Sequence, residues 1–480
     1  MTQTYPLWVA GKPVDGPEPL EIRSPYDGRL VGTTTSASPE QIEEAVAAAH
    51  RLRHEAAALP VHVRADALSA ISRTIADRAD ELAALITAEN GKPMLWARAE
   101  VGRAASVFRI AAEEARRWSG EAMRLDTDKA AEGRLAYVRH VPYGVVLAIS
   151  PFNFPLNLVA HKVAPAIAVG APVVVKPAPK TPLSALALAE IAAETDLPAG
   201  MVSVVNVPNE QASSLVSDER MPVVSFTGSG PVGWKIKEAV PAKHVTLELG
   251  GNAGVVVCGD YTGDDDLAWA ATRIAVFSNY QAGQSCIGVQ RVYVAEAAYD
   301  AFKPKLIDAI AALKVGDPSD EATQVGPVIN EDAAARIETW VREALDSGAA
   351  LLAGGGREGT TVEPTVLEGV PNDAKVACEE VFGPVLMLAK VPDDDAGFAA
   401  VNDSPYGLQA GVFTHSLQTA FRAHRELEVG GVIVGDVPSY RADQMPYGGA
   451  KQSGVGREGL NYAMHDYTYE RVMVLTGLDL

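Results

Sequence analysis

The chain has 480 residues, a length that favours two or three domains over one. Hydrophobic residues make up 48% of the chain and charged residues 21%, which is the balance of an ordinary globular protein and excludes a disordered one. The formal net charge of −20 excludes nucleic acid and anionic membrane surfaces as expected partners, because the protein would be repelled by both.

The chain begins with strand and turn signals and continues with helices. Its first residues, MTQTYPLWVAGKPVDG, lack the basic start and the apolar stretch of a signal peptide, and no later apolar run is long enough to span a bilayer, so we expect a cytoplasmic protein.

An N-cap residue, a proline and a glutamine in SPEQ (38–41) predict a helix start. The Ala- and Glu-rich region that follows reaches about Gly120, with helix breaks predicted at Leu59-Pro60 and at NGKP (90–93).

Two blocks of alternating strands and helices come next. From Val141 to about residue 250, the β-branched runs are GVVLAIS, APVVVK, MVSVVNV, VVSFTG and HVTLELGG. From Gly254 to about Gly435, they are GVVVC, RVYV, GPVLML, AGVFT and GVIVG. This alternation predicts an α/β fold with two parallel sheets, each buried under crossover helices.

Two segments fit neither block. Residues 121–139 follow the helical region, and residues 467–480 end the chain with an alternating, strand-like pattern. An exposed strand of this kind needs a partner, which another subunit can supply.

Cys286 is the candidate nucleophile. It lies in QAGQSC (281–286), where Gly283 and small neighbours let the backbone approach a substrate closely, and a thiolate is the best nucleophile among the side chains. The alternative is a buried structural cysteine, which is our interpretation of Cys258. The three cysteines, Cys258, Cys286 and Cys378, have no metal-ligand spacing, so neither a metal site nor a disulfide framework is expected.

Two polar residues could act with this thiol. Glu248 ends an apolar strand just before Gly250 and Gly251, and a carboxylate at this edge of a parallel sheet faces the place where ligands bind. Desolvation there would raise its pKa and suit it to proton transfer. Asn153, in PFNFP (151–155), can donate a hydrogen bond to an oxyanion. The alternatives are a strand-end carboxylate that accepts loop hydrogen bonds and a polar turn residue.

A glycine-rich turn follows the strand VVSFTG. Residues Gly228, Ser229 and Gly233 lie where a strand gives way to a helix, so backbone N–H groups and a hydroxyl can face a pyrophosphate. Lys176, at the end of APVVVK, can hold a ribose hydroxyl or be a solvated strand-end charge. The turn does not match the usual dinucleotide fingerprint, so spacing alone does not identify NAD.

Taken together, the motifs resemble the aldehyde dehydrogenase superfamily. PFNFP, VVVKPAPKTP, SFTGSGPVG, LELGGN, GQSC, EEVFGPV and PYGGAKQSGVGREG occur here in that family's order over about 300 residues, and the resemblance covers nearly the whole chain. The resemblance implies an aldehyde dehydrogenase-like fold with two Rossmann-like parallel α/β domains and a small β oligomerisation arm. It assigns residues 1–120 and 140–250 to a dinucleotide-binding domain, 251–450 to a catalytic domain, and 121–139 with 467–480 to the arm.

The resemblance also implies a reaction. Cys286 corresponds to the nucleophile, Glu248 to the general base, and the side chain of Asn153 with the backbone N–H of Cys286 to the oxyanion donors. Oxidation of an aldehyde would pass through a thiohemiacetal and a thioester, which water activated by Glu248 hydrolyses. Two alternatives remain open: an acylating enzyme that passes the thioester to coenzyme A, for which Glu248 is unnecessary, and a non-catalytic structural relative, which would not need all three residues.

The cofactor implied is NAD or NADP. Lys176 would hold the adenosine ribose, Ser229 would lie near the pyrophosphate, Glu380 would hold the nicotinamide ribose, and Phe382 would pack beside the nicotinamide. NAD-selective members often have Glu where this chain has Pro179, and Lys180 next to it could attract a phosphate, so we expect a slight preference for NAD with NADP tolerated. The full set of expected cofactor contacts is Ile149, Phe152, Lys176, Pro179, Lys180, Gly228, Ser229, Gly233, Leu249, Glu380 and Phe382.

The expected substrate is a small, polar and anionic aldehyde. Asn157 and His161 lie four and eight residues beyond Asn153 and therefore share one helical face. Arg441 falls in the loop that forms the family's tunnel mouth and suits the bidentate binding of an anion, although it could instead be a surface residue paired with Asp443. The expected substrate contacts are Arg103, Asn157, His161, Ser285 and Arg441.

This set resembles the lactaldehyde, glyceraldehyde-3-phosphate, sulfolactaldehyde and phosphonoacetaldehyde branches of the family. A homodimer or homotetramer is expected, because family members extend the sheet of one subunit with the arm of another.

Overall fold

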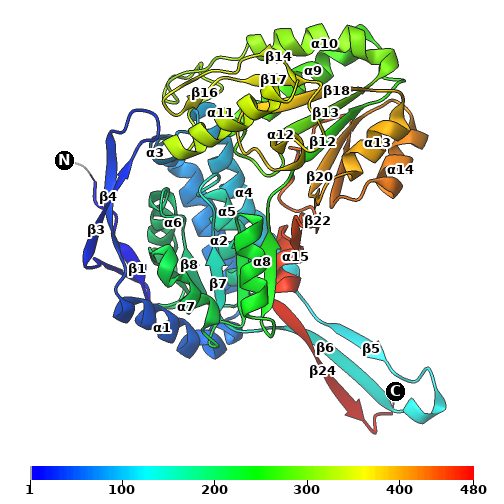
Figure 1. The fold of residues 1–480 in the computed structure, drawn as a ribbon. Helices are drawn as coiled ribbons and strands as arrows, with labels where there is room; N and C mark the ends of the chain where they lie inside the picture. The colour runs from blue at the N-terminus through cyan, green and yellow to red at the C-terminus, as the bar shows by residue number, and fades with distance from the viewer. Residues whose placement is uncertain (1–2, 480) are drawn as a thin grey trace.

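The computed structural model describes residues 3–479, the side chain of Glu210 excepted, and arranges them in two α/β domains and a projecting β arm (Figure 1). The first domain is built on an eight-stranded sheet. In spatial order its strands are β2 (Lys12–Val14), β1 (Leu7–Val9), β9 (Val202–Val204), β8 (Val173–Lys176), β7 (Val146–Ile149), β10 (Val223–Thr227), β11 (His244–Glu248) and β23 (Gly454–Val455). Strands β9 to β11 run parallel, so the five predicted strands of this block are confirmed and their carboxyl ends meet at one edge.

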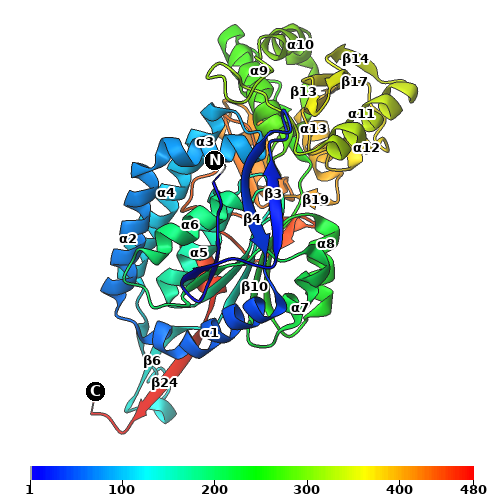
Figure 2. The same ribbon diagram turned by 90° about the vertical axis from the view of Figure 1, so that its left-hand side faces the viewer.

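Helices pack on both sides of this sheet. They are α1 (Pro39–Ala58), α2 (Val61–Asp77), α3 (Ala79–Asn90), α4 (Met94–Arg117), α5 (Asn157–Val169), α6 (Leu183–Ala193), α7 (Ala212–Ser217), α8 (Gly230–Ala239) and α15 (Leu460–Asp466). Figure 2 shows α2, α4 and α5 on one side and α8 on the other. The predicted helix start is confirmed, because Ser38 and Gln41 form a reciprocal capping box. The break after Asn90 is also confirmed, because Gly91 adopts a left-handed φ of 76° there.

The second domain is built on a seven-stranded sheet. Its strands, in spatial order, are β14 (Ala350–Ala353), β17 (Thr365–Glu368), β18 (Val385–Val391), β13 (Val289–Ala295), β12 (Ala253–Val257), β20 (Gln409–Phe413) and β21 (Gly431–Val434). Its helices are α9 (Asp264–Asn279), α10 (Glu296–Ala311), α11 (Glu331–Asp346), α12 (Lys375–Cys378), α13 (Asp394–Asn402) and α14 (Leu417–Glu426). The five predicted strands are present and parallel, and the antiparallel edge strand β14 makes the sheet mixed.

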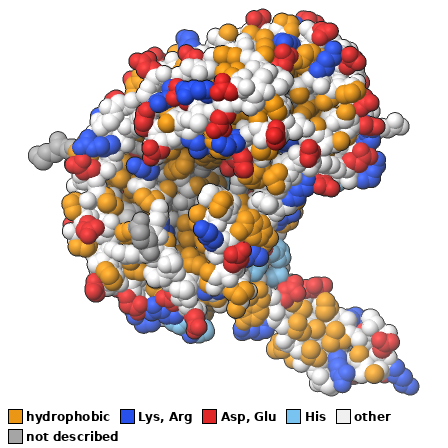
Figure 3. Space-filling model, viewed as in Figure 1, with side chains coloured by type: hydrophobic (Ala, Val, Ile, Leu, Met, Phe, Trp, Pro, Cys, Tyr) orange, Lys and Arg blue, Asp and Glu red, His pale blue; other side chains and the backbone are white. Residues whose placement is uncertain are grey.

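The two orphan segments of the sequence pair with each other. Strand β6 (Arg134–Pro142) lies between β5 (Glu121–Arg124) and β24 (Thr468–Thr476) in an antiparallel sheet. Figure 3 shows apolar side chains gathered on this projecting arm, and on β24 Val472 is 56% exposed and Met473 51%. Short elements complete the fold: β3 (Glu18–Arg23) with β4 (Leu30–Ser36), β15 (Arg357–Glu358) with β16 (Thr361–Val362), β19 (Tyr406–Gly407) with β22 (Ala450–Lys451), and the 3₁₀ turns η1 (Lys129–Ala131), η2 (Asn209–Gln211) and η3 (Tyr280–Gly283).

The chain returns to the first domain near its end. Strand β23 pairs with β11 so that Gly454 faces Glu248, and α15 packs on α4 and α5. Residues 451–466, which the sequence patterns did not assign to either block, therefore belong to the first domain. This return places the loop between β21 and β23 beside the carboxyl edge of the first sheet. Among residues 3–479, no helix is long and apolar enough to cross a membrane.

Candidate active site

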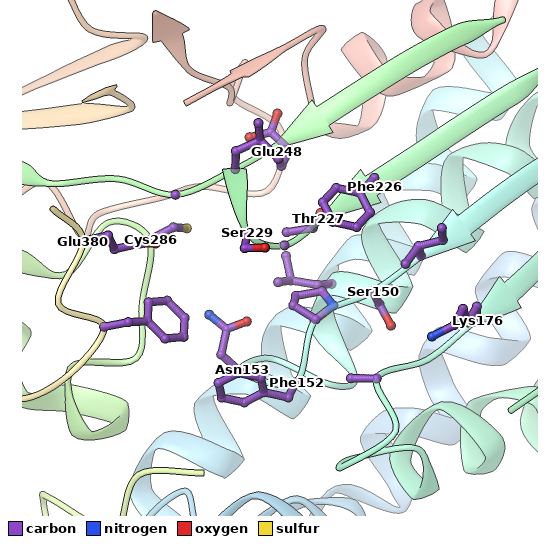
Figure 4. Close-up of a pocket in the computed structure, with 18 of the residues that line it drawn as sticks. Ser150, Phe152, Asn153, Lys176, Phe226, Thr227, Ser229, Glu248, Cys286 and Glu380 are labelled. Carbon is purple, nitrogen blue, oxygen red and sulfur yellow. The ribbon is translucent and has the colours of Figure 1, made fainter. Parts of the chain in front are cut away.

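A cavity of about 470 Å³ lies at the carboxyl ends of the parallel strands of the first domain, and residues of the second domain contribute to its lining. It is lined by Ile149–Asn153, Leu158, Lys176, Ala178, Pro179, Asn209, Phe226–Ser229, Glu248–Gly250, Cys286, Arg336, Glu380 and Phe382. In Figure 4, Cys286 and Asn153 face the same space from the two domains, and Lys176 lies at the opposite end of the cavity. This is the edge of an open α/β sheet where ligands characteristically bind.

Cys286 is held on a tight loop after α9. Gln281 and Ala282 adopt left-handed φ angles of 55° and 52°, and a side chain at Gly283 would meet the carbonyl oxygen of Gly383 at 2.0 Å, so glycine is required there. Burial raises the pKa of the Cys286 thiol to about 12, although a hydrogen bond with Tyr447 lowers it. The thiol is therefore protonated at neutral pH and needs a proton acceptor before it can attack.

Glu248, the last residue of β11, is the available proton acceptor. Its side chain is buried, and neither carboxylate oxygen has a hydrogen-bond partner among the described residues. Burial raises the pKa of Glu248 well above its usual range, and the nearby charge of Glu458 adds to this rise. A carboxyl group with a raised pKa is a better base when ionised and a stable acid when protonated.

Asn153 is fixed in the loop between β7 and α5. Its side-chain Nδ2 donates to the carbonyl oxygen of Gln284, at 2.9 Å, which ties it to the cysteine loop. Its backbone is held as well, because Lys92 Nζ donates to the Asn153 carbonyl oxygen at 2.8 Å and Asn90 Nδ2 to that of Phe152 at 2.7 Å. The amide therefore has a set direction beside Cys286, as an oxyanion donor requires.

Most of the predicted cofactor contacts line the large cavity. Ser229 is the N-cap of α8 and caps no backbone group of that helix. Lys176 Nζ donates to Asn209 Oδ1 at 3.0 Å. Burial raises the pKa of Glu380 to about 7, and its Oε1 accepts from the backbone N–H of Gly251 at 2.9 Å. Phe382, with a left-handed φ of 49°, meets the ring of Phe152 edge to face.

Two predicted cofactor contacts lie outside the cavity lining. The side chain of Lys180 is exposed to solvent beyond the cavity rim. Gly233 lies inside α8, where a Cβ atom would meet Leu249 Cδ2 at 2.3 Å. Gly233 therefore lets α8 pack closely on the strand end and acts through helix position. Asn209 and Arg336 line the cavity without having been predicted.

A second, smaller cavity of about 30 Å³ lies behind Cys286 and Glu248. It is lined by Arg103, Phe154, Asn157, Leu158, Thr227, Glu248, Tyr280, Ser285, Cys286, Ile287, Arg441, Tyr447 and Glu458. Four predicted substrate contacts, Arg103, Asn157, Ser285 and Arg441, are in this lining. The fifth, His161, lies just outside it, where its Nδ1 is 3.4 Å from Arg441 Nη2.

Arg441 is buried and makes a different ion pair from the one considered in the sequence. Its Nη2 is 3.0 Å from Glu458 Oε2, its guanidinium lies 3.8 Å from the ring centroid of Tyr447, and its Nε has no hydrogen-bond partner among the described residues. Asp443 pairs with Arg103 at 2.8 Å instead. The alternative of a surface arginine paired with Asp443 is therefore wrong.

Burial and polar contacts set the charges around Arg441. Burial and the nearby charge of Arg441 lower the pKa of His161 to about 4, so its ring is neutral at neutral pH. For Asp443, burial alone would raise the pKa, but hydrogen bonds from His161 and Arg103 hold it at about 2. The arginines are therefore the cations that face the small cavity.

Sequence reasoning did not single out Tyr447, Glu458, Tyr280 or Lys162. Lys162, on α5, contacts Glu458 Oε1 through its Nζ at 3.0 Å, and the hydroxyl of Tyr280 contacts Ser285 Oγ at 2.6 Å. Tyr447 and Glu458 both lie in the motif PYGGAKQSGVGREG, which was the only signal for them. Lys162 and Tyr280 carried no signal that separates them from core residues.

Comparison with known proteins shows what the chain is similar to. The aldehyde dehydrogenase family pattern matches residues 8–473. The 3-sulfolactaldehyde dehydrogenase of Priestia aryabhattai is 41% identical over 472 residues, which are 98% of each chain. Among solved structures, aldehyde dehydrogenase 21 from Physcomitrella patens in complex with the reaction product succinate has 43% identity and a TM-score of 0.97, covering 100% of this chain and 99% of that one. The glyceraldehyde-3-phosphate dehydrogenase GapN from Methanocaldococcus jannaschii, complexed with NADP, has 34% identity and a TM-score of 0.91, covering 96% and 100%.

Proposed function

The chain belongs to the aldehyde dehydrogenase family, and we propose that it oxidises a small, anionic aldehyde to its carboxylic acid with NAD(P)⁺, through a thioester on Cys286. The observation that carries this proposal is the convergence of three groups on one cavity wall: the Cys286 thiol, the unpartnered Glu248 carboxylate and the Asn153 amide. A nucleophile, a base and an oxyanion donor are what acyl chemistry at an aldehyde needs.

The large cavity has groups that fit a nicotinamide dinucleotide. The N-terminus of α8, with Gly228 and Ser229, offers N–H groups and a hydroxyl to the pyrophosphate. Lys176 would bind the adenosine ribose and Glu380 the nicotinamide ribose, and Phe382 would pack beside the nicotinamide. When bound, the cofactor supplies the hydride acceptor. Because Pro179 provides no carboxylate to repel a 2′-phosphate, we propose that NADP is tolerated and NAD slightly preferred.

Glu248, Cys286 and Asn153 each have a separate role in the proposed reaction. Glu248 takes the thiol proton of Cys286, and the thiolate sulfur then forms a bond to the aldehyde carbon. The electron pair of the carbonyl moves to its oxygen, where the Asn153 amide and the backbone N–H of Cys286 stabilise the negative charge. Once Glu248 has released the thiol proton to solvent and the thioester is present, Glu248 removes a proton from a water molecule that attacks the thioester, and the thiolate of Cys286 leaves. An acylating enzyme would not need this second role.

The substrate class is proposed from the small cavity. Its volume of about 30 Å³ favours a short chain over a long or aromatic one. The buried Nε–H of Arg441 lacks a partner, and such a donor is stabilised by an acceptor oxygen that arrives with the substrate. Arg103 lies on the same lining. The relatives named for sulfolactaldehyde and crystallised with succinate are handling anionic molecules, which supports the proposal.

We propose in addition that the arm joins two or four copies of the chain. The exposed Val472 and Met473 of β24 support this, because an exposed apolar strand is stabilised by a partner. Sedimentation of the protein with and without a Val472→Asp change tests it: loss of the oligomer is expected, and an unchanged oligomer would refute the role of the arm.

The experiment that tests the function measures formation of the reduced cofactor with a panel of aldehydes. Succinic semialdehyde, lactaldehyde, glyceraldehyde 3-phosphate and sulfolactaldehyde represent short polar substrates, and hexanal and benzaldehyde the apolar ones, each with NAD and with NADP. Highest kcat/KM with the anionic members is expected. A preference for hexanal or benzaldehyde would overturn the substrate class, and a product that forms only with coenzyme A would overturn hydrolysis.

A further inference from the structure

We propose that Tyr447 is a further catalytic residue, whose phenol O–H donates a hydrogen bond to the sulfur of Cys286 and stabilises it as a thiolate. This inference rests on the proposed role of Cys286 as the nucleophile. The hydroxyl oxygen of Tyr447 lies 3.1 Å from Cys286 Sγ, well within the distance of a hydrogen bond to sulfur. Among the described residues, Tyr447 is the one whose side chain is within hydrogen-bond distance of this sulfur.

The position of the phenol is fixed from three sides. The backbone of Tyr447 exchanges two hydrogen bonds with that of Glu458, at 2.9 and 2.7 Å. Its ring packs in an apolar cluster with Ile287 and Leu408, and the guanidinium of Arg441 covers one ring face. The side chain is 3% exposed. The donor is therefore in place before a substrate arrives, so no reorganisation is needed when the thiolate forms.

The direction of the hydrogen bond follows from the chemistry of the two groups. Burial raises the pKa of Tyr447 well above its usual value, and the neighbouring Cys286 and Glu248 add to this rise while Arg441 opposes it. The phenol therefore keeps its own proton and acts as the donor. The proton of the thiol leaves for Glu248, and the O–H bond of Tyr447 remains intact.

The hydrogen bond from Tyr447 opposes several effects that disfavour the thiolate of Cys286. Burial raises the pKa of the Cys286 thiol, the nearby Glu380 and Glu248 raise it further, and Tyr447 and Arg441 lower it. A hydrogen bond to a charged acceptor is stronger than one to a neutral acceptor, so the phenol favours the thiolate over the thiol. The same donor stabilises the sulfur again when it leaves the thioester.

The alternative is that the hydroxyl only fills space in the cavity wall. Tyr447→Phe keeps the ring, the contact with Arg441 and the apolar packing and removes only the hydroxyl. The rate at which iodoacetamide alkylates Cys286 in the free protein reports thiolate formation without substrate or cofactor. It is measured as a function of pH, and binding of NADH to each variant checks that the large cavity is intact.

In Tyr447→Phe we expect the alkylation rate near neutral pH to fall by about 10- to 100-fold, as for loss of a hydrogen bond to a charged group. Tyr467→Phe is the matched control, because its side chain is also buried but packs in the core of the first domain and lines neither cavity. Its alkylation profile should stay within about twofold of the wild type.

Equal alkylation profiles for the wild type and Tyr447→Phe would overturn the inference, as would an equal fall in Tyr467→Phe. Cys286→Ala separates this failure from failure of the proposed function. If Cys286→Ala still oxidises aldehydes, the nucleophile itself is wrongly assigned. If it is inactive while Tyr447→Phe alkylates like the wild type, only the role of Tyr447 falls.

Discussion

The ammonium group of Lys92 and the carboxylate of Glu100 form an ion pair that is completely enclosed in the first domain. The pair holds the middle and the C-terminal end of the loop that carries Asn153. Lys92 donates to the Asn153 carbonyl oxygen, and the second oxygen of Glu100 accepts from the backbone N–H groups of Leu156 and Asn157, at 3.0 and 3.1 Å. This buried ion pair therefore fixes the position of the loop that carries Asn153, the proposed oxyanion donor.

Breaking this pair should destabilise the protein strongly. Lys92→Met leaves the carboxylate of Glu100 buried without its cation, and we expect the free energy of unfolding in urea to fall by about 3 to 5 kcal/mol. The double change Lys92→Met/Glu100→Gln should recover part of this loss, because no charge is left unpaired. Arg109→Met, which removes an exposed pair with Glu113 on the same helix as Glu100, should cost less than about 1 kcal/mol. A Lys92→Met protein as stable as this control contradicts the prediction.

Replacing the nucleophile should separate chemistry from cofactor binding. In Cys286→Ala we expect dehydrogenation to be abolished, because no other nucleophile faces the aldehyde carbon in the proposed mechanism. Binding of NADH, followed by its fluorescence, should change by less than about threefold, since the thiol acts on the substrate. Cys258→Ala is the control: Cys258 is buried in the second sheet, and turnover should remain. Turnover in Cys286→Ala would rule out the thioester mechanism.

Residues beside glycine or proline motifs were the ones that the sequence could indicate. Glu248 is marked by the two glycines that follow it, and Cys286 by the small residues before it, because tight loops leave a signature in composition. Tyr447 also lies in such a motif, between Pro446 and Gly448, but the motif did not indicate its role, and Lys162 lies in no such motif. Their roles depend on which side chains meet when the chain returns from the second domain to β23, and this long-range contact has no local pattern.

The contacts of Lys180 and Gly233 with the cofactor stay predictions. Neither residue is part of the cavity lining: Lys180 is exposed to solvent, and Gly233 lets α8 pack closely on Leu249. The strands and the two-sheet architecture were predictable because burial imposes a repeating pattern of β-branched residues. The pairing of the two arm segments was open, since an exposed sheet lacks such a pattern.

Removing the base should slow both steps in which Glu248 accepts a proton, the attack by the thiol and the hydrolysis of the thioester. In Glu248→Gln the thioester cannot be hydrolysed efficiently, so we expect at most a single burst of reduced cofactor and a steady rate lower by about 10²- to 10⁴-fold. Hydroxylamine, which attacks a thioester without needing a base, should restore part of the turnover and yield a hydroxamate. A steady rate close to that of the wild type would remove Glu248 from the mechanism, and a loss that hydroxylamine does not relieve would place its role before the thioester.

Stability should fall with rising pH through Glu380. Burial raises the pKa of this carboxyl to about 7 in the folded protein from its usual 4.5, so the folded state holds more protons than the unfolded state between these values. The free energy of unfolding therefore decreases as pH rises through this window, by up to about 3 kcal/mol for this group. Glu380→Gln should lose correspondingly less stability between about pH 4.5 and pH 7, measured by urea unfolding. Parallel pH profiles for the two proteins would contradict this.

The two arginines of the small cavity should distinguish charged from neutral substrates. Arg103→Gln and Arg441→Gln each remove a cation from the lining, so kcat/KM for succinic semialdehyde should fall by about 10- to 100-fold, the value of a charge-assisted hydrogen bond. For butanal, which has the same carbon chain without the carboxylate, the fall should stay below about threefold. Arg109→Gln is the matched control, because Arg109 lies on the same helix as Arg103 and pairs with Glu113 on the surface. It should change neither substrate. Equal losses for the anionic and the neutral aldehyde would show that the arginines support the fold of the cavity, and the anion would then have to be bound elsewhere.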